Sequence, residues 1–457
     1  MSRINVNLDL VRKYNIPGPR YTSYPPATRF SKELAWPTLA GELIRNNRTQ
    51  RPLSLYFHIP FCESLCWYCG CNTVITTRKS SGAIYLDALE KEMDLMLPAL
   101  NPEREVVQIH LGGGTPTFLS PDELRRLGEM IRSRFRIAAD MEGGVEIDPR
   151  RLSFDHIVAL REAGFNRASL GVQDFDPKVQ LAVHRIQPYE LTLQAVEWLR
   201  ANRFASVNVD LIYGLPHQNV ASFSRTLEAV LELEPDRLAV FSYAHVPWIK
   251  PSQKLLEKAL PSVEEKLLIL KLVIETLTGE DRFAYIGMDH FARPDDELAI
   301  AQRNGTLHRN FQGYSTRRGT DIYSFGMSAI SQIESLYWQN HKGLSDYYQA
   351  LERRETPVAR GYLLTREDQI RRATIMRLMC DGALDFSALS EALHIDFRAH
   401  FSAELQSLDD LEEDGLIRQT AWGLEATETG RLFIRNLAMR FDATLPRSTQ
   451  QHFSRTI

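Results

Sequence analysis

The chain contains little cysteine, with only five in 457 residues, and four of the five lie between positions 62 and 71. A disulfide framework would spread its partners through the fold, so this clustering argues against one. No uncharged apolar run approaches roughly 18 residues, so no membrane span is expected. Basic residues are not in excess either, because the net charge is −4, and nucleic acid is therefore not an expected partner. These absences favour a small-molecule ligand.

The amino-terminal stretch lacks the apolar core of a signal peptide, so we expect a cytoplasmic protein whose thiols stay reduced. The composition, 44% hydrophobic and 25% charged, is that of an ordinary globular protein. The length allows two or three domains at roughly 100 to 200 residues each.

The sequence does contain a dense thiol motif. Cys62, Cys66 and Cys69 have the spacing C-x3-C-x2-C, and Cys71 follows two positions later. Zinc sites usually draw on two separated cysteine pairs, which makes a zinc site the weaker interpretation. Three thiolates in one loop can instead hold an iron–sulfur cube and leave one iron without a protein ligand. The motif therefore favours a single 4Fe-4S cluster.

From about residue 53, short β-branched or aromatic runs alternate with amphipathic segments, which predicts βα units around a parallel sheet. Ser120 is the expected N-cap of one helix. Seven strands indicate an α/β fold built as an open, partial barrel. The expected strands are residues 53–59, 106–111, 144–147, 167–172, 206–212, 237–243 and 283–288, and the expected helices are 83–97, 121–135, 154–163, 191–202, 221–233 and 263–277.

Polar residues recur at the carboxyl ends of these expected strands, where barrel enzymes place their chemistry. A purely structural barrel would fill such positions with Val, Ile and Leu, so a polar ligand is expected over the barrel mouth. The residues that share a strand face by period two are Tyr56 with His58, Glu146 with Asp148, Ser169 with Gly171 and Gln173, and Asn208 with Asp210.

Two flanking regions differ from the barrel at 51–360. Residues 1–50 are rich in proline and predict an extended arm with little helix or strand. Residues 361–457 predict a mostly helical domain with one hairpin at 416–423, an arrangement that resembles a winged helix. This domain holds 11 Arg and no Lys against 15 Asp and Glu, so we expect it to cover a substrate rather than bind DNA.

The thiol motif resembles that of radical S-adenosylmethionine (SAM) enzymes, in which an aromatic residue precedes the third cysteine, as Tyr68 does here. Cys71 and the preceding His58-Ile-Pro-Phe-Cys62 narrow the resemblance to the oxygen-independent coproporphyrinogen III oxidases. Further matching segments are residues 13–15, 18–25, 112–117, 146–150, 171–174, 210–216, 287–294 and 308–314.

This resemblance implies a radical SAM barrel, similar to a partial TIM barrel, that acts on coproporphyrinogen III in haem biosynthesis. Reductive cleavage of SAM by the cluster would generate a radical that takes hydrogen from a propionate side chain. Loss of carbon dioxide would then convert two propionates to vinyl groups and give protoporphyrinogen IX. The resemblance further implies two bound SAM molecules, a donor such as flavodoxin or ferredoxin, an unidentified electron acceptor, and a monomer.

The same resemblance assigns residues. It makes Cys62, Cys66 and Cys69 the ligands of the cluster. It places Tyr56, Tyr68, Gly113, Gly114, Thr115 and Glu146 on SAM, Gln173, Arg185 and Asp210 on a second SAM, and Ala244 and Ile330 at the adenine sites. It gives catalytic roles to Tyr56, Cys71, Phe311 and Gln312.

Several interpretations stay open at this point. His58 fits a structural histidine nearly as well, Arg185 could lie on a solvated helix face, and Cys71 could be a buried small side chain or a spare ligand. Residues 311–312 could belong to a surface loop. Arginines would suit the propionate carboxylates, but no spacing selects among Arg20, Arg293, Arg309 and Arg317.

Two alternative functions also remain. A related radical SAM protein that transfers haem without decarboxylation typically lacks the last cysteine and the amino-terminal arm. This chain has both, as Cys71 and residues 20–25. A zinc-stabilised binding protein without catalysis would be colourless and would hold one zinc ion.

Overall fold

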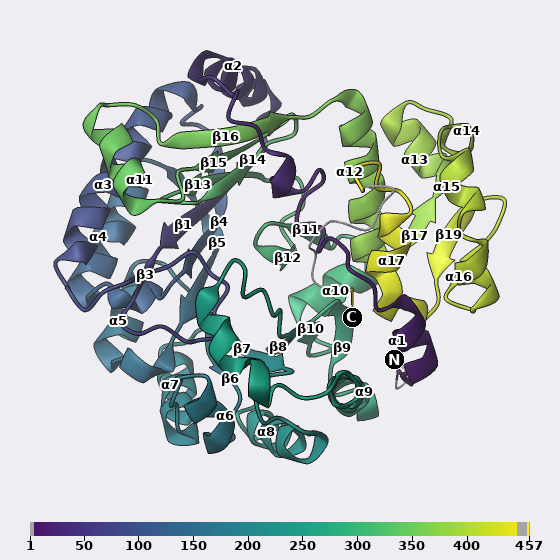
Figure 1. The fold of residues 1–457 in the computed structure, drawn as a ribbon. Coiled ribbons are helices and arrows are strands. Elements are labelled where there is room, and N and C mark those ends of the chain that lie inside the picture. Colours follow the sequence, from purple (N-terminus) through teal and green to yellow (C-terminus); the bar gives the residue numbers. More distant parts are fainter. Residues whose placement is uncertain (1–3, 446–454, 457) are drawn as a thin grey trace.

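The computed structural model describes residues 4–445 and 455–456, and within them twelve strands form one open sheet. Seven adjacent strands are parallel, and they form the barrel-like part of the molecule (Figure 1). In sheet order these strands are β13 (Asp321–Phe325), β1 (Leu53–Ile59), β4 (Glu105–Gly113), β5 (Arg136–Ile147), β6 (Arg167–Gln173), β7 (Ser206–Tyr213) and β8 (Arg237–Ser242).

Antiparallel strands extend the parallel set at both edges, so the sheet does not close on itself. Beyond β13 lie β14 (Ile330–Gln332), β15 (Leu336–Asn340) and β16 (Val358–Leu363), and beyond β8 lie β10 (His290–Ala292) and β9 (Ala284–Gly287). The expected open α/β barrel is confirmed.

One expected strand has a different place. The segment at 283–288 forms β9, which antiparallel β10 separates from the parallel set. The seventh parallel strand is β13, which the sequence pattern missed. Its sequence, Asp-Ile-Tyr-Ser-Phe, is only five residues long and begins with a buried Asp321. That aspartate is accommodated by a buried ion pair with Arg104, a tertiary contact with no local signal.

Helices between the parallel strands cover the outer face of the sheet (Figure 1). They are α3 (Ser81–Met96), α4 (Pro121–Arg132), α5 (Phe154–Glu162), α6 (Pro177–Ala182), α7 (Tyr189–Ala201), α8 (Val220–Glu232) and α9 (Val263–Thr278). Helix α4 begins as expected, because the Ser120 side chain accepts a hydrogen bond from the amide of Glu123 and the Glu123 side chain accepts one from the amide of Ser120. Among the described residues, no helix is long and apolar enough to cross a membrane.

The amino-terminal segment contains more helix than the sequence indicated. Helix α1 (Leu8–Tyr14) and helix α2 (Trp36–Asn46) flank an irregular stretch. In α2, Pro37 occupies the first turn, where it is tolerated, and Leu39 and Leu43 are buried. The segment crosses the molecule from α1, beside the carboxyl-terminal helices, to α2 at the opposite side (Figure 1).

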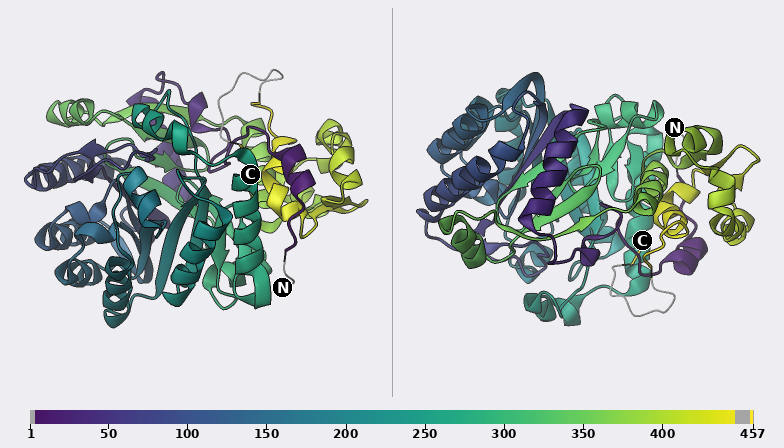
Figure 2. Two further views of the ribbon diagram at one scale, coloured as in Figure 1. Left: turned by 60° about the horizontal axis from the view of Figure 1, so that its bottom comes forward. Right: turned by 90° about the horizontal axis from the view of Figure 1, so that it is seen from above.

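The carboxyl-terminal region forms a separate group of helices at one side of the molecule (Figure 2). The expected hairpin is present as β18 (Ile417–Gln419) and β19 (Gly423–Ala426), joined by β17 (Ala383–Asp385) in a small sheet. The sequence pattern predicts one helix at 397–409, and the structure has three short helices in this part of the chain. The helices here are α12 (Arg366–Asp381), α13 (Phe386–Leu393), α14 (Phe397–His400), α15 (Ser402–Gln406), α16 (Asp409–Glu413) and α17 (Ile434–Met439).

The remaining elements are short. Strands β2 (Phe61–Cys62) and β3 (Val74–Ile75) pair within the cysteine loop, and β11 (His308–Asn310) and β12 (Gly313–Ser315) form a hairpin. Helices α10 (Glu297–Arg303) and α11 (Leu344–Glu352) lie near the two edges of the sheet (Figure 1).

Candidate active site

A cavity of about 480 Å³ opens at the carboxyl ends of the parallel strands. The cysteine loop forms one side, and the ends of β4 to β8 form another. The expected site residues that line it are Cys62, Cys66, Tyr68, Cys69, Cys71, Gly113, Gly114, Thr115, Glu146, Gln173, Arg185, Asp210 and Ala244. The fold therefore brings together side chains spread over more than 180 positions of the sequence.

The cysteine loop presents thiols with hydrogen-bond donors around them. Arg150 Nη2 and Arg185 Nη1 lie 3.5 and 3.6 Å from Cys66 Sγ, and the Cys71 amide donates to Cys69 Sγ at 3.4 Å. Cationic and N–H donors of this kind stabilise thiolates, the form that binds iron. The residues present thus fit an iron–sulfur cluster. Among the described residues, no three His, Cys, Asp or Glu side chains converge on a single metal ion.

The glycines after β4 allow a close approach of backbone to the cysteine loop. Gly113 has φ of +116°, and a Cβ there would lie 2.6 Å from the His58 ring. A Cβ on Gly114 would lie 2.6 Å from the carbonyl oxygen of Pro60. Glycine is therefore required at both positions by packing. The amides of Gly113 and Gly114 are bonded to Glu146 and to the Ile59 carbonyl, and the lack of side chains lets a ligand approach this strand end closely.

Two acidic side chains line the cavity without an Arg or Lys partner among the described residues. Glu146 accepts a hydrogen bond from the Gly113 amide at 3.0 Å and lies 3.5 Å from His110 Nε2. Burial opposes ionisation of Glu146, but His110 and the Gly113 amide outweigh it and lower the pKa of the carboxyl group. For Asp210, burial dominates and raises the pKa to about 6, although Ser169 donates a hydrogen bond to it at 2.8 Å.

Strand register explains why these polar groups meet. Glu146 on β5 pairs with Ser169 on β6, and Ser169 pairs with Asn208 on β7. Asn208 Nδ2 donates to Asp210 Oδ1 at 2.7 Å and to Ser169 Oγ at 2.8 Å. The polar positions of neighbouring strands therefore form a continuous row along one edge of the cavity, as their strand-end placement predicted.

Arg185 is buried rather than on a solvated helix face. Its side chain is 8% exposed, donates to Asp148 Oδ2 at 3.0 Å and to the carbonyl of Gly171 at 2.6 Å, and leaves Nε without a partner. Arg150 also binds Asp148, at 2.6 Å. Burial opposes ionisation of Asp148, yet the two arginines lower its pKa to about 2. Asp148 and Arg150 line the cavity. Asp148 is one of the polar strand-end residues that the sequence indicated, whereas Arg150 was not expected there, although it lies in the matching segment 146–150.

Tyr56 and His58 lie behind the cavity lining rather than in it. Tyr56 Oη and His58 Nδ1 form a hydrogen bond of 3.1 Å, and His58 Nε2 lies 3.0 Å from the Asn72 carbonyl oxygen. Tyr56 also stacks on His110, with ring centroids 5.9 Å apart. Both nitrogens of His58 therefore have partners, and the ring ties β1 to the cysteine loop, as a structural histidine would.

Besides Tyr56, three expected site residues do not line this cavity, namely Phe311, Gln312 and Ile330. Phe311, between β11 and β12, packs edge-on against Tyr337 at 5.7 Å in an apolar cluster that also contains Ile330 and Phe30 of the arm. Gln312 is partly buried, and its backbone amide donates to Asn310 Oδ1. Its side-chain Nε2 has no partner among the described residues. Phe311 and Ile330 therefore lie together beneath the amino-terminal arm.

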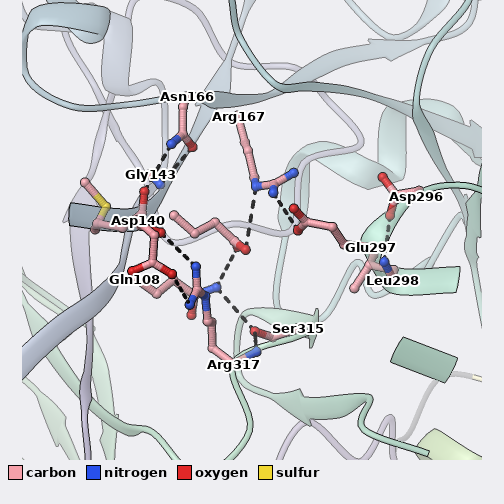
Figure 3. A network of polar contacts seen from close by, with 12 residues as sticks. Gln108, Asp140, Gly143, Asn166, Arg167, Asp296, Glu297, Leu298, Ser315 and Arg317 are labelled. Carbon is pink, nitrogen blue, oxygen red and sulfur yellow. Dashed lines mark hydrogen bonds and ion pairs between the residues drawn. The ribbon is translucent and has the colours of Figure 1, made fainter. Parts of the chain in front are cut away.

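The four candidate arginines fall into two groups. Arg317 binds Asp140 Oδ2 at 3.2 Å and the Asp140 carbonyl at 2.8 Å, within a polar network that includes Gln108 and Ser315 (Figure 3). Arg293 donates to the carbonyls of Pro235 and Glu234. Arg20 and Arg309, by contrast, are neighbours, since Arg309 Nη2 donates to the Arg20 carbonyl at 3.3 Å.

Comparisons with known proteins agree with this geometry. Residues 56–230 match the model of the radical SAM superfamily, and residues 364–433 match the HemN C-terminal domain. The oxygen-independent coproporphyrinogen III oxidase of Synechocystis sp. is 48% identical over 99% of this chain and 98% of its own length. The Escherichia coli enzyme of the same name is 46% identical over the whole of both chains. The solved structure of coproporphyrinogen III oxidase from Escherichia coli, described as a radical SAM enzyme, covers 97% of this chain and 100% of its own with a TM-score of 0.92 at 44% identity.

Proposed function

The chain belongs to the family of oxygen-independent coproporphyrinogen III oxidases, and from this premise we propose roles for the residues around its cavity. It is a radical SAM enzyme that converts two propionate side chains of coproporphyrinogen III to vinyl groups, giving protoporphyrinogen IX for haem biosynthesis. Its membership favours this activity over haem transfer without decarboxylation. The observation that carries the assignment is the single cavity that the thiol loop and the polar strand ends share.

Cys62, Cys66 and Cys69 hold the iron–sulfur cluster in this proposal. When bound, the cluster and SAM supply an organic radical that can remove hydrogen from an unactivated carbon, which no side-chain acid or base can do at neutral pH. The chain's own contribution is to surround the sulfurs of Cys66 and Cys69 with the N–H donors of Arg150, Arg185 and the Cys71 amide.

The strand ends hold the cofactor. Glu146, kept ionised by His110 and the Gly113 amide, accepts hydrogen bonds from a ribose hydroxyl or from the ammonium group of SAM. The backbone of residues 113–115 meets the amino-acid end, and Tyr68 lies beside it in the cysteine loop. Each of these contacts uses a group that already lines the cavity.

We assign a second SAM molecule to the other half of the cavity. Gln173, Arg185, Asp210 and Ala244 surround this half, and Asp210 offers a carboxylate to a cationic ligand. Ile330 lies outside the lining, so it would act on the second adenine only after a shift of β14. Equilibrium dialysis of the reconstituted protein with labelled SAM should give two molecules bound per chain, and a value of one would contradict this assignment.

Four residues have proposed roles in the reaction. The Cys71 thiol lines the cavity next to Cys69 and is placed to donate a hydrogen or a proton near the substrate. Tyr56 holds His110 and His58 behind Glu146, and so positions that carboxylate. Phe311 packs beneath the amino-terminal arm, where it and the adjacent Gln312 would position the arm over the substrate.

The remaining partners follow from the chemistry. The cluster needs one electron from outside, for which flavodoxin or ferredoxin is suitable, and decarboxylation leaves an electron for an acceptor of unknown identity. We propose a monomer located in the cytoplasm, where thiols stay reduced and the cluster can assemble.

Anaerobic turnover tests this function. Reconstituted protein with coproporphyrinogen III, dithionite and SAM should form protoporphyrinogen and 5′-deoxyadenosine together. Both products should disappear in Cys66→Ser and persist in Cys380→Ala, whose thiol is buried away from the cavity. Cleavage of SAM without protoporphyrinogen would contradict the decarboxylase assignment and favour the haem-transfer alternative.

A further inference from the structure

A second cavity adjoins the active site. It has a volume of about 320 Å³ and shares Ser242, Tyr243, Ala244 and Val246 with the first as a common wall. Three parts of the chain enclose it, namely the amino-terminal arm, the barrel at β8 and α9, and the carboxyl-terminal region near α17. Much of its lining is apolar, including Val240, Val273, Ile274, Leu432 and Phe291.

The charged groups of this cavity do not balance. Of the described residues, four cations line it, Arg20, Lys266, Arg435 and Arg455, against one carboxylate, Asp289. Arg20 forms an ion pair with Asp289. The other three cations make no ion pair with any carboxylate that the structure describes. We call this volume the cationic cavity.

Arg435 shows the imbalance most clearly. It is 4% exposed, and among the described residues its guanidinium donates only to carbonyl oxygens, those of Gly18, Pro19 and Arg455. Lys266 is similar, because its ammonium donates to the carbonyl of Tyr243 at 3.0 Å and stacks over the Tyr213 ring at 5.7 Å. A buried cation without a counter-ion is costly to the folded protein.

A third buried guanidinium reinforces this charge. Arg309 is 2% exposed, donates to the Arg20 carbonyl, and leaves both Nε and Nη1 without a partner. Its charge acts on Arg435 and on His290, which also experience Arg20 and Asp289. Arg20 and Arg435 both act on Asp289, and Arg309 adds a further buried positive charge beside Arg20.

We propose that the cationic cavity binds a propionate carboxylate of the tetrapyrrole while another propionate of the same molecule lies in the active-site cavity. This rests on the proposed function. Propionates that are not reacting keep their negative charge, and Arg435 and Lys266 supply the missing counter-ions. The apolar lining suits the pyrrole ring and its methyl group. Binding energy gained here positions the reacting propionate on the other side of the shared wall.

The assignment also explains why the arm and the carboxyl-terminal region meet. Arg20 comes from the arm, Lys266 from α9 and Arg435 from α17, so no single part of the chain could build the site. Arg435 fixes the arm through Gly18 and Pro19, and this places Arg20 against Asp289. The cavity is complete only when all three parts are docked.

The test compares charged and uncharged ligands. Coproporphyrin III and its tetramethyl ester are titrated into anaerobically reconstituted protein, with fluorescence as the readout. Lys266→Met keeps the length of the side chain and removes its charge. Arg435→Gln also removes a charge, but it is the more disruptive substitution. Each should raise the Kd of the tetra-acid about tenfold, since a charge-assisted hydrogen bond is lost, while the Kd of the ester changes by less than about twofold.

Arg293→Gln is the matched control. Its guanidinium also binds two backbone carbonyls but lines neither cavity, so its Kd values should equal those of the parent. Thermal denaturation identifies any loosening of the arm in Arg435→Gln, in which case Lys266→Met, which loses only one hydrogen bond, decides.

Equal Kd values for the tetra-acid in Lys266→Met and the parent would overturn the proposal, as would equal losses for acid and ester. The proposed function fails separately, through a parent that cleaves SAM but does not decarboxylate coproporphyrinogen III. Turnover in the parent together with an unchanged KM in Lys266→Met would leave the function intact and remove the cationic cavity from it.

Discussion

Two neighbouring cavities of this enzyme carry opposite unmatched charges. In the active-site cavity, Glu146 and Asp210 have no Arg or Lys partner among the described residues, whereas in the cationic cavity Lys266 and Arg435 have no carboxylate. SAM carries a sulfonium and an ammonium, and coproporphyrinogen carries carboxylates. Each cavity therefore lacks the charge that its proposed ligand brings, and Ser242, Tyr243, Ala244 and Val246 line both.

The difference shows how binding energy can be divided. A protein selected only for stability would pair Lys266 or Asp210 internally, because buried unmatched charges are unfavourable. Keeping them unmatched weakens the free protein and strengthens the complex. The pairs that are matched, Arg150 and Arg185 with Asp148, lie beside the thiols of the cysteine loop.

Reversing the charge of Lys266 should have the largest effect on substrate binding. Lys266→Glu would place a carboxylate against the substrate carboxylate, and we expect KM for coproporphyrinogen III to rise by roughly 100-fold or more. The affinity for SAM should change little, since Glu146 and Asp210 remain in place. Steady-state kinetics with each ligand varied in turn measures both effects. A parallel loss of SAM affinity would mean that the two cavities are not independent binding sites.

Neutralising Asp210 in the active-site cavity should instead weaken the binding of SAM and leave the binding of coproporphyrin III unchanged. In Asp210→Asn we expect SAM to bind about tenfold more weakly, as a charge-assisted contact becomes neutral, while coproporphyrin III binds as before. Isothermal titration with each ligand provides the measurement. Weaker binding of coproporphyrin III in this variant would contradict the division of charge.

Asp210→Asn should also stabilise the unliganded protein. The folded pKa of Asp210 is about 6, above the unfolded value of about 3.9, so the folded state holds the proton more tightly. The parent therefore loses stability as pH rises from about 4 to 6, by at most about 3 kcal/mol, and does not regain it at pH 7. Asp210→Asn should remove this pH dependence and raise Tm at pH 7.

Glu92→Gln is a control for that measurement. Glu92 is a buried carboxylate whose pKa burial raises to about 7, but it accepts hydrogen bonds from Tyr347, Asn340 and Gly326 and lines neither cavity. Its substitution should change stability and leave SAM affinity unaltered. A Tm of Asp210→Asn below that of the parent would show that the hydrogen bonds from Ser169 and Asn208 outweigh the buried charge.

The active-site cavity could be predicted from the sequence, and the cationic cavity could not. The thiol loop, the glycines at 113–114 and the strand-end carboxylates have local spacing, and parallel strands bring their ends to one edge. The charge imbalance around Arg435 arises from its contacts with Gly18 and Pro19, more than 400 positions away, and has no local pattern.

The candidate arginines illustrate the same limit. Sequence composition offered Arg20, Arg293, Arg309 and Arg317 as equals, and only tertiary partners distinguish them. Strand β13 was missed for a related reason, because its buried Asp321 makes the segment look polar until the ion pair with Arg104 is known.

Binding of the tetra-acid should also depend on pH through Lys266. Burial and, to a smaller extent, the charge of Arg455 lower the pKa of this ammonium to about 8. The other groups facing it are the Tyr213 ring from β7 and the carbonyl of Tyr243, which follows β8. The charge is present below pH 8 and is lost as pH rises through that value, so Kd should increase between pH 7 and 9. Lys266→Arg should flatten this dependence, and a parent that is already flat would contradict the role of Lys266.

The smallest effect belongs to Arg317, whose ion-pair partner Asp140 lies outside both cavities. Arg317→Gln removes an ion pair with Asp140, whose side chain is 78% exposed, and such pairs contribute about 0–1 kcal/mol. We expect Tm to fall slightly and the Kd of coproporphyrin III to stay within about twofold of the parent. Fluorescence titration of this variant beside Lys266→Met asks whether positive charge in general, or only unmatched charge at the cationic cavity, attracts the substrate. Equal losses in the two variants would favour general charge, because Arg317 lines neither cavity.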